Sequence, residues 1–164
     1  MRLLKQWFGP RQAPPLPRPE TPVCLIGDIH GRADLLDAML EKIDAQPDSA
    51  KTRIIVLGDM IDRGPDSLLV LHRLFDLQTA RPDQVTCLMG NLERMMLDFI
   101  TSPDAHTGWL RGGGNATAIS AALDPSETPG RLSQALSEAL APQIHGWVRT
   151  LPLKWLSGGL LAVH

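Results

Sequence analysis

Three short glycine-containing motifs, each placed directly after an apolar run, constrain this chain more than any other feature. The motifs are GDIHG at 27–31, GDMIDRG at 58–64 and GNLE at 90–93. The runs before them predict buried strands, and they span Val23–Ile26, Ile54–Leu57 and Val85–Met89. An apolar pattern with helical spacing follows each motif. Repeated strand–helix units predict an α/β fold, in which residues at the carboxyl ends of strands gather where such proteins bind ligands.

The composition is that of one ordinary globular domain. The chain has 164 residues, of which 43% are apolar and 21% charged, and its net charge of −2 gives no basic field that would make nucleic acid an obligatory partner. Cys24 and Cys87 both lie in predicted strands, which favours core thiols over a disulfide. No transmembrane segment or signal peptide is recognisable, and we expect a cytoplasmic protein.

Two parts of different character are expected. Residues 1–20 alternate proline with arginine and predict a flexible tail, whereas residues 21–164 form the folded domain. Within the domain, the helix after the second motif should open at Pro65 and a later one at Pro129, each at the favoured first helical position. The glycine triplet at 112–114 predicts a flexible loop.

A hairpin is expected at the end of the chain. Two apolar runs, 151–156 and 160–163, flank Ser157-Gly158-Gly159. His164 follows the second run, so it is either a ligand for a second metal ion or an ordinary surface residue at a strand end.

The first two motifs carry residues suited to divalent metal ions. Asp28 and His30 are two residues apart in a strand-end turn, so a carboxylate oxygen and an imidazole nitrogen can bind one ion. Asp59 follows a second strand and can reach the same place, where a carboxylate can bridge two ions. The alternative for Asp59 is to cap the following helix.

Two further residues, Arg63 and Asn91, have two possible roles each. The guanidinium of Arg63 can clamp two phosphoryl oxygens, although Asp62 and Arg63 could equally form a salt bridge within their loop. Asn91 offers a neutral oxygen ligand, or it caps the helix after the third motif.

In order and spacing, these motifs resemble the phosphoprotein phosphatase branch of the calcineurin-like metallophosphoesterases. The family's GDxHG, GDxxDRG, GNHE and later strand ending in HAG correspond here to GDIHG, GDMIDRGPDS, GNLERMM and LLAVH. The resemblance runs from about Pro22 to His164, and is greatest to small bacterial serine/threonine phosphatases, with symmetrical diadenosine tetraphosphate hydrolases as near relatives. It implies a metallophosphoesterase-type mixed β-sandwich flanked by helices and incomplete at the C-terminus.

The resemblance also implies a dinuclear-metal phosphoester hydrolase that uses a metal-bound hydroxide. Manganese would be the metal, with iron or zinc as alternatives. The first ion would be held by Asp28 and His30, the second by Asn91 and His164, and both by Asp59. Arg63 would bind the substrate phosphate, and Asp62 would orient the histidine that protonates the leaving group.

Two departures from the family pattern bear on activity. Leu92 stands where the family has that histidine, and a general acid typically contributes about 10²–10⁴-fold to the rate. The chain also ends at His164, before the family's remaining sheet. The lead interpretation is a serine/threonine protein phosphatase acting on phosphorylated protein. The alternatives are a dinucleoside polyphosphate hydrolase acting on a small phosphoester, or a degenerate phosphatase that binds phosphorylated partners without turnover.

Overall fold

The computed structural model describes residues 16–164. Residues 1–15, most of the predicted tail, lie outside the described part. Nearer the domain, the Pro17 carbonyl accepts a hydrogen bond of 2.6 Å from the Gly159 N–H, which fastens this segment to the turn of the C-terminal hairpin. The boundary between residues 20 and 21 stays a prediction.

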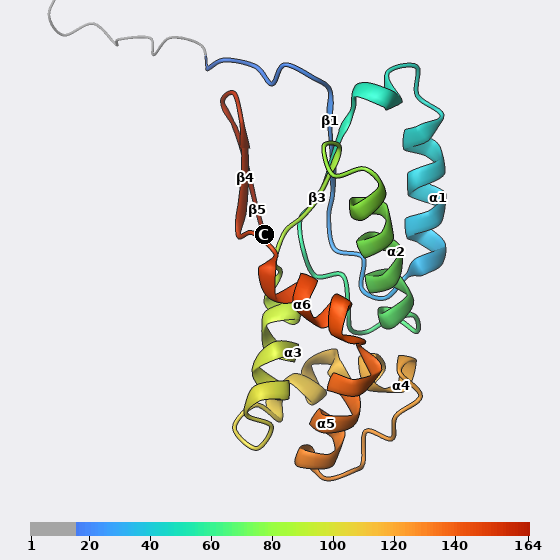
Figure 1. Ribbon diagram of the computed structural model, residues 1–164, viewed down its shortest axis with the longest axis vertical. Helices are drawn as coiled ribbons and strands as arrows, with labels where there is room; N and C mark the ends of the chain where they lie inside the picture. Colours follow the sequence, from blue (N-terminus) through green and yellow to red (C-terminus); the bar gives the residue numbers. More distant parts are fainter. Residues whose placement is uncertain (1–15) are drawn as a thin grey trace, which may run out of the picture.

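A three-stranded parallel sheet carries the site (Figure 1). Strands β1 (Val23–Ile26), β2 (Arg53–Val56) and β3 (Val85–Cys87) pair in the order β1-β2-β3. The three predicted strands are therefore confirmed, although the second and third end before the apolar runs do. The central strand is covered on both faces, because its apolar residues from 54 to 56 are at most 2% exposed.

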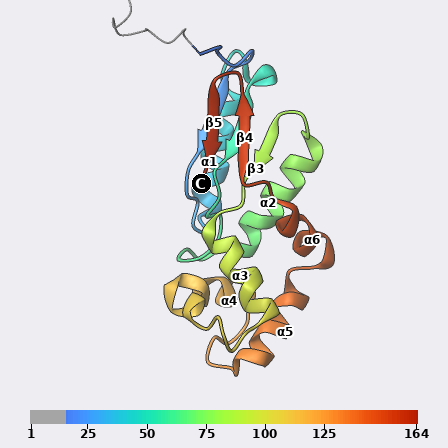
Figure 2. The same cartoon turned by 90° about the vertical axis from the view of Figure 1, so that its left-hand side faces the viewer.

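The sheet lies between two helices and a hairpin. Helices α1 (Ala33–Asp44) and α2 (Ser67–Ala80) lie on one side in Figure 1, and strands β4 (Lys154–Ser157) and β5 (Leu160–Val163) lie on the other. Figure 2 shows the antiparallel hairpin in front of the sheet. Its inner residues Trp155 and Ala162 pack against Ile55 and Leu88. The mixed α/β sandwich and the predicted hairpin are thus confirmed.

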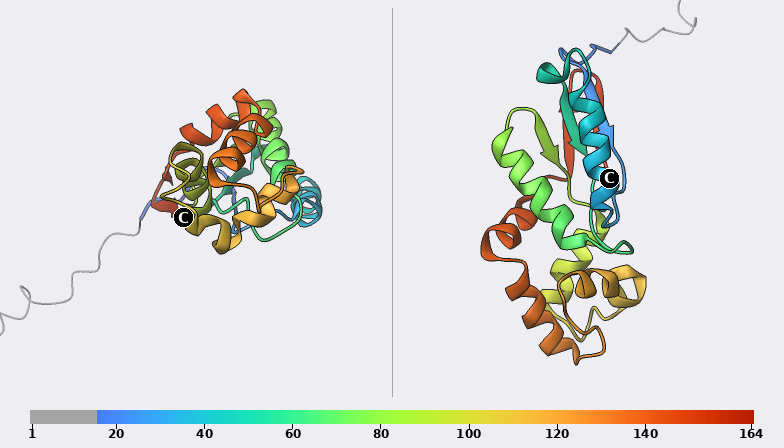
Figure 3. Two further views of the ribbon diagram at one scale, coloured as in Figure 1. Left: turned by 90° about the horizontal axis from the view of Figure 1, so that it is seen from below. Right: turned by 90° about the vertical axis from the view of Figure 1, so that its right-hand side faces the viewer.

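The remaining helices gather at one end of the molecule, below the sheet in Figure 1 and in the right-hand view of Figure 3. They are α3 (Asn91–Thr101), α4 (Asn115–Ser120), α5 (Pro129–Ala139) and α6 (Pro142–Thr150), together with the short segment η2 (Leu110–Gly114) near α4. The other short segment, η1 (Ser49–Lys51), follows α1 and lies at the opposite end of the molecule. Their apolar faces and the α1–α2 side of the sheet share one buried cluster. Helix α5 begins at Pro129, as predicted.

Two local expectations are wrong. Helix α2 begins at Ser67 and not at Pro65, because Asp66 has a non-helical backbone, with φ −122° and ψ 36°, and its N–H donates to the Gly31 carbonyl at 2.9 Å. The glycine triplet is part of the kinked helical segment η2 and not a flexible loop. The Gly113 carbonyl accepts a hydrogen bond from the Arg63 N–H at 3.3 Å, so this segment packs directly against the second motif.

Both cysteines are free thiols, as predicted. Cys87 is fully buried, and burial raises the pKa of its thiol to about 12, so it stays protonated in the core. Among residues 16–164, no helix combines the length and the apolar character that a membrane crossing requires.

Candidate metal centre

The loops after β1 and β2 bring three predicted ligands into one group. Asp28, His30 and Asp59 each offer a ligand atom, and these atoms lie within 4.8 Å of one another. The His30 Nε2 atom is 3.5 Å from Asp28 Oδ2. The Asp28 side chain is 54% exposed and that of Asp59 only 7%. The group therefore opens to solvent on the Asp28 side and is enclosed on the Asp59 side.

Hydrogen bonds fix the tautomer of His30. Its Nδ1 atom lies 3.2 Å from the Ile61 carbonyl oxygen, which can only accept, so Nδ1 carries the proton. The Nε2 atom accepts a hydrogen bond of 2.8 Å from the Arg63 guanidinium. An imidazole in this state presents its lone pair at Nε2, the form that binds a metal ion. A cation and Arg63 would compete for that lone pair.

A second pair of predicted ligands lies beside Asp59. The Nε2 atom of His164, directly after β5, is 2.8 Å from Asn91 Oδ1 and 3.3 Å from Asp59 Oδ1. Asp59 therefore belongs to both groups, which is the position that a bridging carboxylate requires. The structure brings all five predicted ligands together at the carboxyl ends of the strands.

The capping alternatives have different outcomes. Asn91 is the first residue of α3, and Gly90 occupies the capping position, so the alternative that Asn91 caps this helix is wrong. Asp59 does accept the N–H of Leu92 at 3.1 Å. It caps the start of α3, however, and not the helix that follows its own motif.

The loops of the second and third motifs meet backbone to backbone. A Cβ atom on Gly58 would lie 2.5 Å from the Gly90 nitrogen, and one on Gly90 would collide with the backbone nitrogen of Asp59. Only glycine fits this approach at both positions. The contact sets the distance between Asp59 and Asn91.

Asp62 belongs to the same motif as the candidate ligand Asp59 but lies in the interior of the protein. Its side chain is fully buried, and burial raises the pKa of its carboxyl above the ordinary value. Oδ2 accepts a hydrogen bond of 2.8 Å from Trp109 Nε1, and Oδ1 accepts one of 2.6 Å from Thr117 Oγ1. Sequence reasoning missed these two partners, which lie 47 and 55 residues away and carry no motif. The carboxylate ties the Arg63 loop to the helical end of the molecule.

Replacing Trp109 with Phe is expected to lower the free energy of unfolding by about 1–3 kcal/mol, because the buried Asp62 carboxylate loses a donor. Urea denaturation followed by circular dichroism measures this loss. Trp147→Phe is the matched control, since within the described part of the chain the buried Trp147 N–H has no hydrogen-bond partner. Equal losses in the two variants would attribute the effect to ring volume and not to the bond.

Position 92 offers no proton to a substrate. The Leu92 side chain is 4% exposed and belongs to the buried cluster, together with Met96 one turn later. Leu92 therefore extends the buried apolar face of α3. The histidine that Asp62 was expected to orient is therefore replaced by a core residue.

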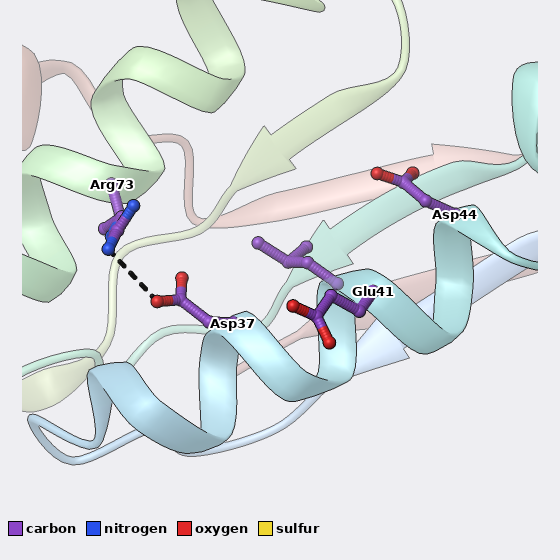
Figure 4. Close-up of a pocket in the computed structure, with 5 residues that line it drawn as sticks. Asp37, Glu41, Asp44 and Arg73 are labelled. Carbon is purple, nitrogen blue, oxygen red and sulfur yellow. Dashed lines mark ion pairs between the residues drawn. The ribbon is translucent and has the colours of Figure 1, made fainter.

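A separate surface hollow between α1 and α2 contains none of the predicted ligands (Figure 4). It is lined by Asp37, Leu40, Glu41, Asp44 and Arg73. Arg73 forms an ion pair of 3.1 Å with Asp37, so the single basic group of the hollow is already paired within it. The strand ends, and not this hollow, hold the residue types suited to metal-dependent chemistry.

Comparisons with known proteins cover most of the chain. Residues 21–159 match the profile of a family described as calcineurin-like phosphoesterase. The chain is 38% identical to serine/threonine-protein phosphatase 1 of Salmonella typhimurium over 93 residues, which are 57% of this chain and 39% of that protein. It is 46% identical to a symmetrical bis(5'-nucleosyl)-tetraphosphatase of Cellvibrio japonicus over 72 residues, 44% of this chain and 24% of that one.

The fold also matches a solved structure. The chain superimposes with a TM-score of 0.52 and 18% identity on a candidate diadenosine tetraphosphatase, covering 91% of this chain and 52% of that one. At this identity the match concerns the fold alone. The matched regions span 24–52% of the length of these three relatives.

Proposed function

Since this chain belongs to the calcineurin-like phosphoesterase family, we propose that it hydrolyses phosphoesters with two divalent metal ions held at the strand ends. One observation carries the proposal: ligand atoms of Asp28, His30 and Asp59 converge within 4.8 Å, and Asn91 and His164 adjoin the same Asp59 carboxylate. The donors are three oxygen-bearing and two imidazole side chains, a set that fits manganese, iron or zinc. We favour manganese.

Bound ions would supply Lewis acidity and a water molecule of lowered pKa. The chain's own residues would do the rest. Asp28 and His30 would hold one ion, Asn91 and His164 the other, and Asp59 both. The Arg63 guanidinium would bind the substrate phosphate, and its contact with His30 Nε2 supports this by showing that it reaches the ligand group. Asp62, anchored by Trp109 and Thr117, would hold the Arg63 loop in place.

The substrate is proposed as phosphoserine or phosphothreonine in proteins, the class named for the Salmonella relative. Leu92 supports a second candidate, a dinucleoside polyphosphate, because a phosphate leaving group needs little protonation and this position cannot supply a proton. The remaining alternative is binding of phosphorylated partners without turnover. A cytoplasmic location is proposed on the two free thiols.

Calorimetric titration with Mn²⁺, followed by hydrolysis assays, tests the proposal. We expect manganese binding and manganese-dependent release of phosphate from p-nitrophenyl phosphate. A phosphoserine peptide and diadenosine tetraphosphate, assayed in parallel, distinguish the two substrate classes. Binding of the phosphopeptide without phosphate release would support the degenerate phosphatase. A chain that binds no manganese at millimolar concentration would refute the proposal.

A further inference from the structure

Glu93, the last residue of the third motif, is a fully buried carboxylate on the first turn of α3. Its Oε2 atom accepts the N–H groups of Asp59 at 2.9 Å and Gly90 at 3.0 Å. Its Oε1 atom accepts those of Met60 at 2.8 Å and Ile61 at 3.3 Å. One side chain therefore satisfies four backbone donors from two different loops.

Three of these donors are consecutive, from residues 59 to 61. Successive N–H groups that point at one place form the concave arrangement by which proteins bind anions, and here the protein's own carboxylate fills it. The arrangement requires a left-handed backbone at Asp59, where φ is 48°. A residue other than glycine stays in this conformation only where its surroundings enforce it. Glu93 supplies that enforcement through the N–H of Asp59 itself.

The hydrogen bonds continue from this loop to the first motif. The Asp59 carbonyl accepts the N–H groups of Ile29 at 3.0 Å and His30 at 3.1 Å. The Met60 carbonyl accepts the N–H of Gly31 at 2.8 Å. A displacement of the backbone at 59–61 would therefore move the loop that carries Asp28 and His30 as well.

We propose that Glu93 is a positioning residue that fixes the three ligand-bearing loops relative to one another, without binding metal or substrate. Each of its oxygens already accepts two N–H groups, which leaves the side chain no role as a ligand. The inference rests on the proposed function in one respect only, which is that the loops bind metal ions. The loop geometry itself can be tested without any metal.

Hydrogen exchange of the metal-free protein is the first experiment. In the unsubstituted chain, the amides of residues 59, 60, 61 and 90 should exchange as slowly as those of β2. The side-chain nitrogen of Glu93→Gln cannot accept a hydrogen bond. The two backbone amides that bond to the replaced oxygen, either those of residues 59 and 90 or those of residues 60 and 61, should therefore exchange about tenfold faster or more, while β2 keeps its protection. Fast exchange of all four amides in the unsubstituted chain would overturn the proposal, even if no Glu93 variant folds.

Manganese affinity is the second measurement. Calorimetry should show the affinity of Glu93→Gln reduced by about 10–100-fold, the usual effect of removing a partner of a metal ligand. Met96→Ala is the control, because this buried residue of the same helix makes no side-chain hydrogen bond to the loops and its loss destabilises α3 through packing alone. Even if Met96→Ala lowers the melting temperature as much as Glu93→Gln does, it should bind manganese with the affinity of the unsubstituted chain.

The outcomes separate the two proposals. Equal affinity losses in Glu93→Gln and Met96→Ala would reduce Glu93 to a structural residue. If the unsubstituted chain binds no manganese, the proposed function fails, and hydrogen exchange still decides the role of Glu93.

Discussion

Replacing Asp59 with Asn is expected to abolish tight binding of a second manganese ion and to lower turnover of p-nitrophenyl phosphate by about 10²–10³-fold. The reason is its position. Asp59 adjoins His30 and Asp28 on one side and has an oxygen 3.3 Å from His164 on the other. An amide can still accept the Leu92 N–H, but it lacks the negative charge that two neighbouring cations require. Calorimetry gives the stoichiometry, and initial rates give the turnover.

The control is Asp28→Asn, which removes a charge from the first group alone. It should weaken one manganese site and leave the other at its original affinity. Unchanged stoichiometry in Asp59→Asn would contradict a bridging role. Identical behaviour of the two variants would mean that Asp59 contributes to one site only.

The second large effect is expected at position 92. Leu92→His should raise turnover of a phosphoserine peptide by about 10²–10⁴-fold, the contribution typical of a general acid. Turnover of p-nitrophenyl phosphate should change little, since its leaving group departs without a proton. The position is suitable because the Leu92 backbone is hydrogen-bonded to Asp59 at 3.1 Å, next to the proposed ions. Steady-state kinetics with both substrates measures the difference.

Leu92→Asn separates proton transfer from packing, because it is similar in size to leucine and polar but cannot donate a proton at neutral pH. It should not raise turnover of the peptide. If histidine changes both substrates by the same factor, its effect is on the packing of α3 and not on leaving-group protonation.

The fold was predictable where one local pattern decides the structure. Unbroken apolar runs such as Ile54–Leu57 are typical of strands covered on both faces, and β2 is such a strand. The rule that polar residues gather at strand ends then located Asp28, His30 and Asp59. The ends of elements were less predictable. The non-helical backbone of Asp66 delays the start of α2, and no apolar pattern indicates it.

The omissions have different physical causes. Helix α6 was not expected, since it buries only Ile144 and Val148 and so shows too short an apolar stripe. No local sequence pattern predicts the hydrogen bond from Trp109 to Asp62, because the two residues lie 47 positions apart in the chain. Glu93 was the one detectable omission. An acid three residues after a cap position is typical of a capping box, which the structure contains.

The left-handed residues of the loops have a consequence for how this protein can be changed. His30, Asp59, Asp62 and Arg63 all have positive φ, between 48° and 71°. Each such residue costs on the order of 1 kcal/mol relative to glycine, so the centre is assembled at the expense of the stability of the whole chain. Selection for thermal tolerance alone would therefore favour glycine at these positions and erode the function first. A stabilised variant of this protein is best sought in the helices, with these four residues held fixed.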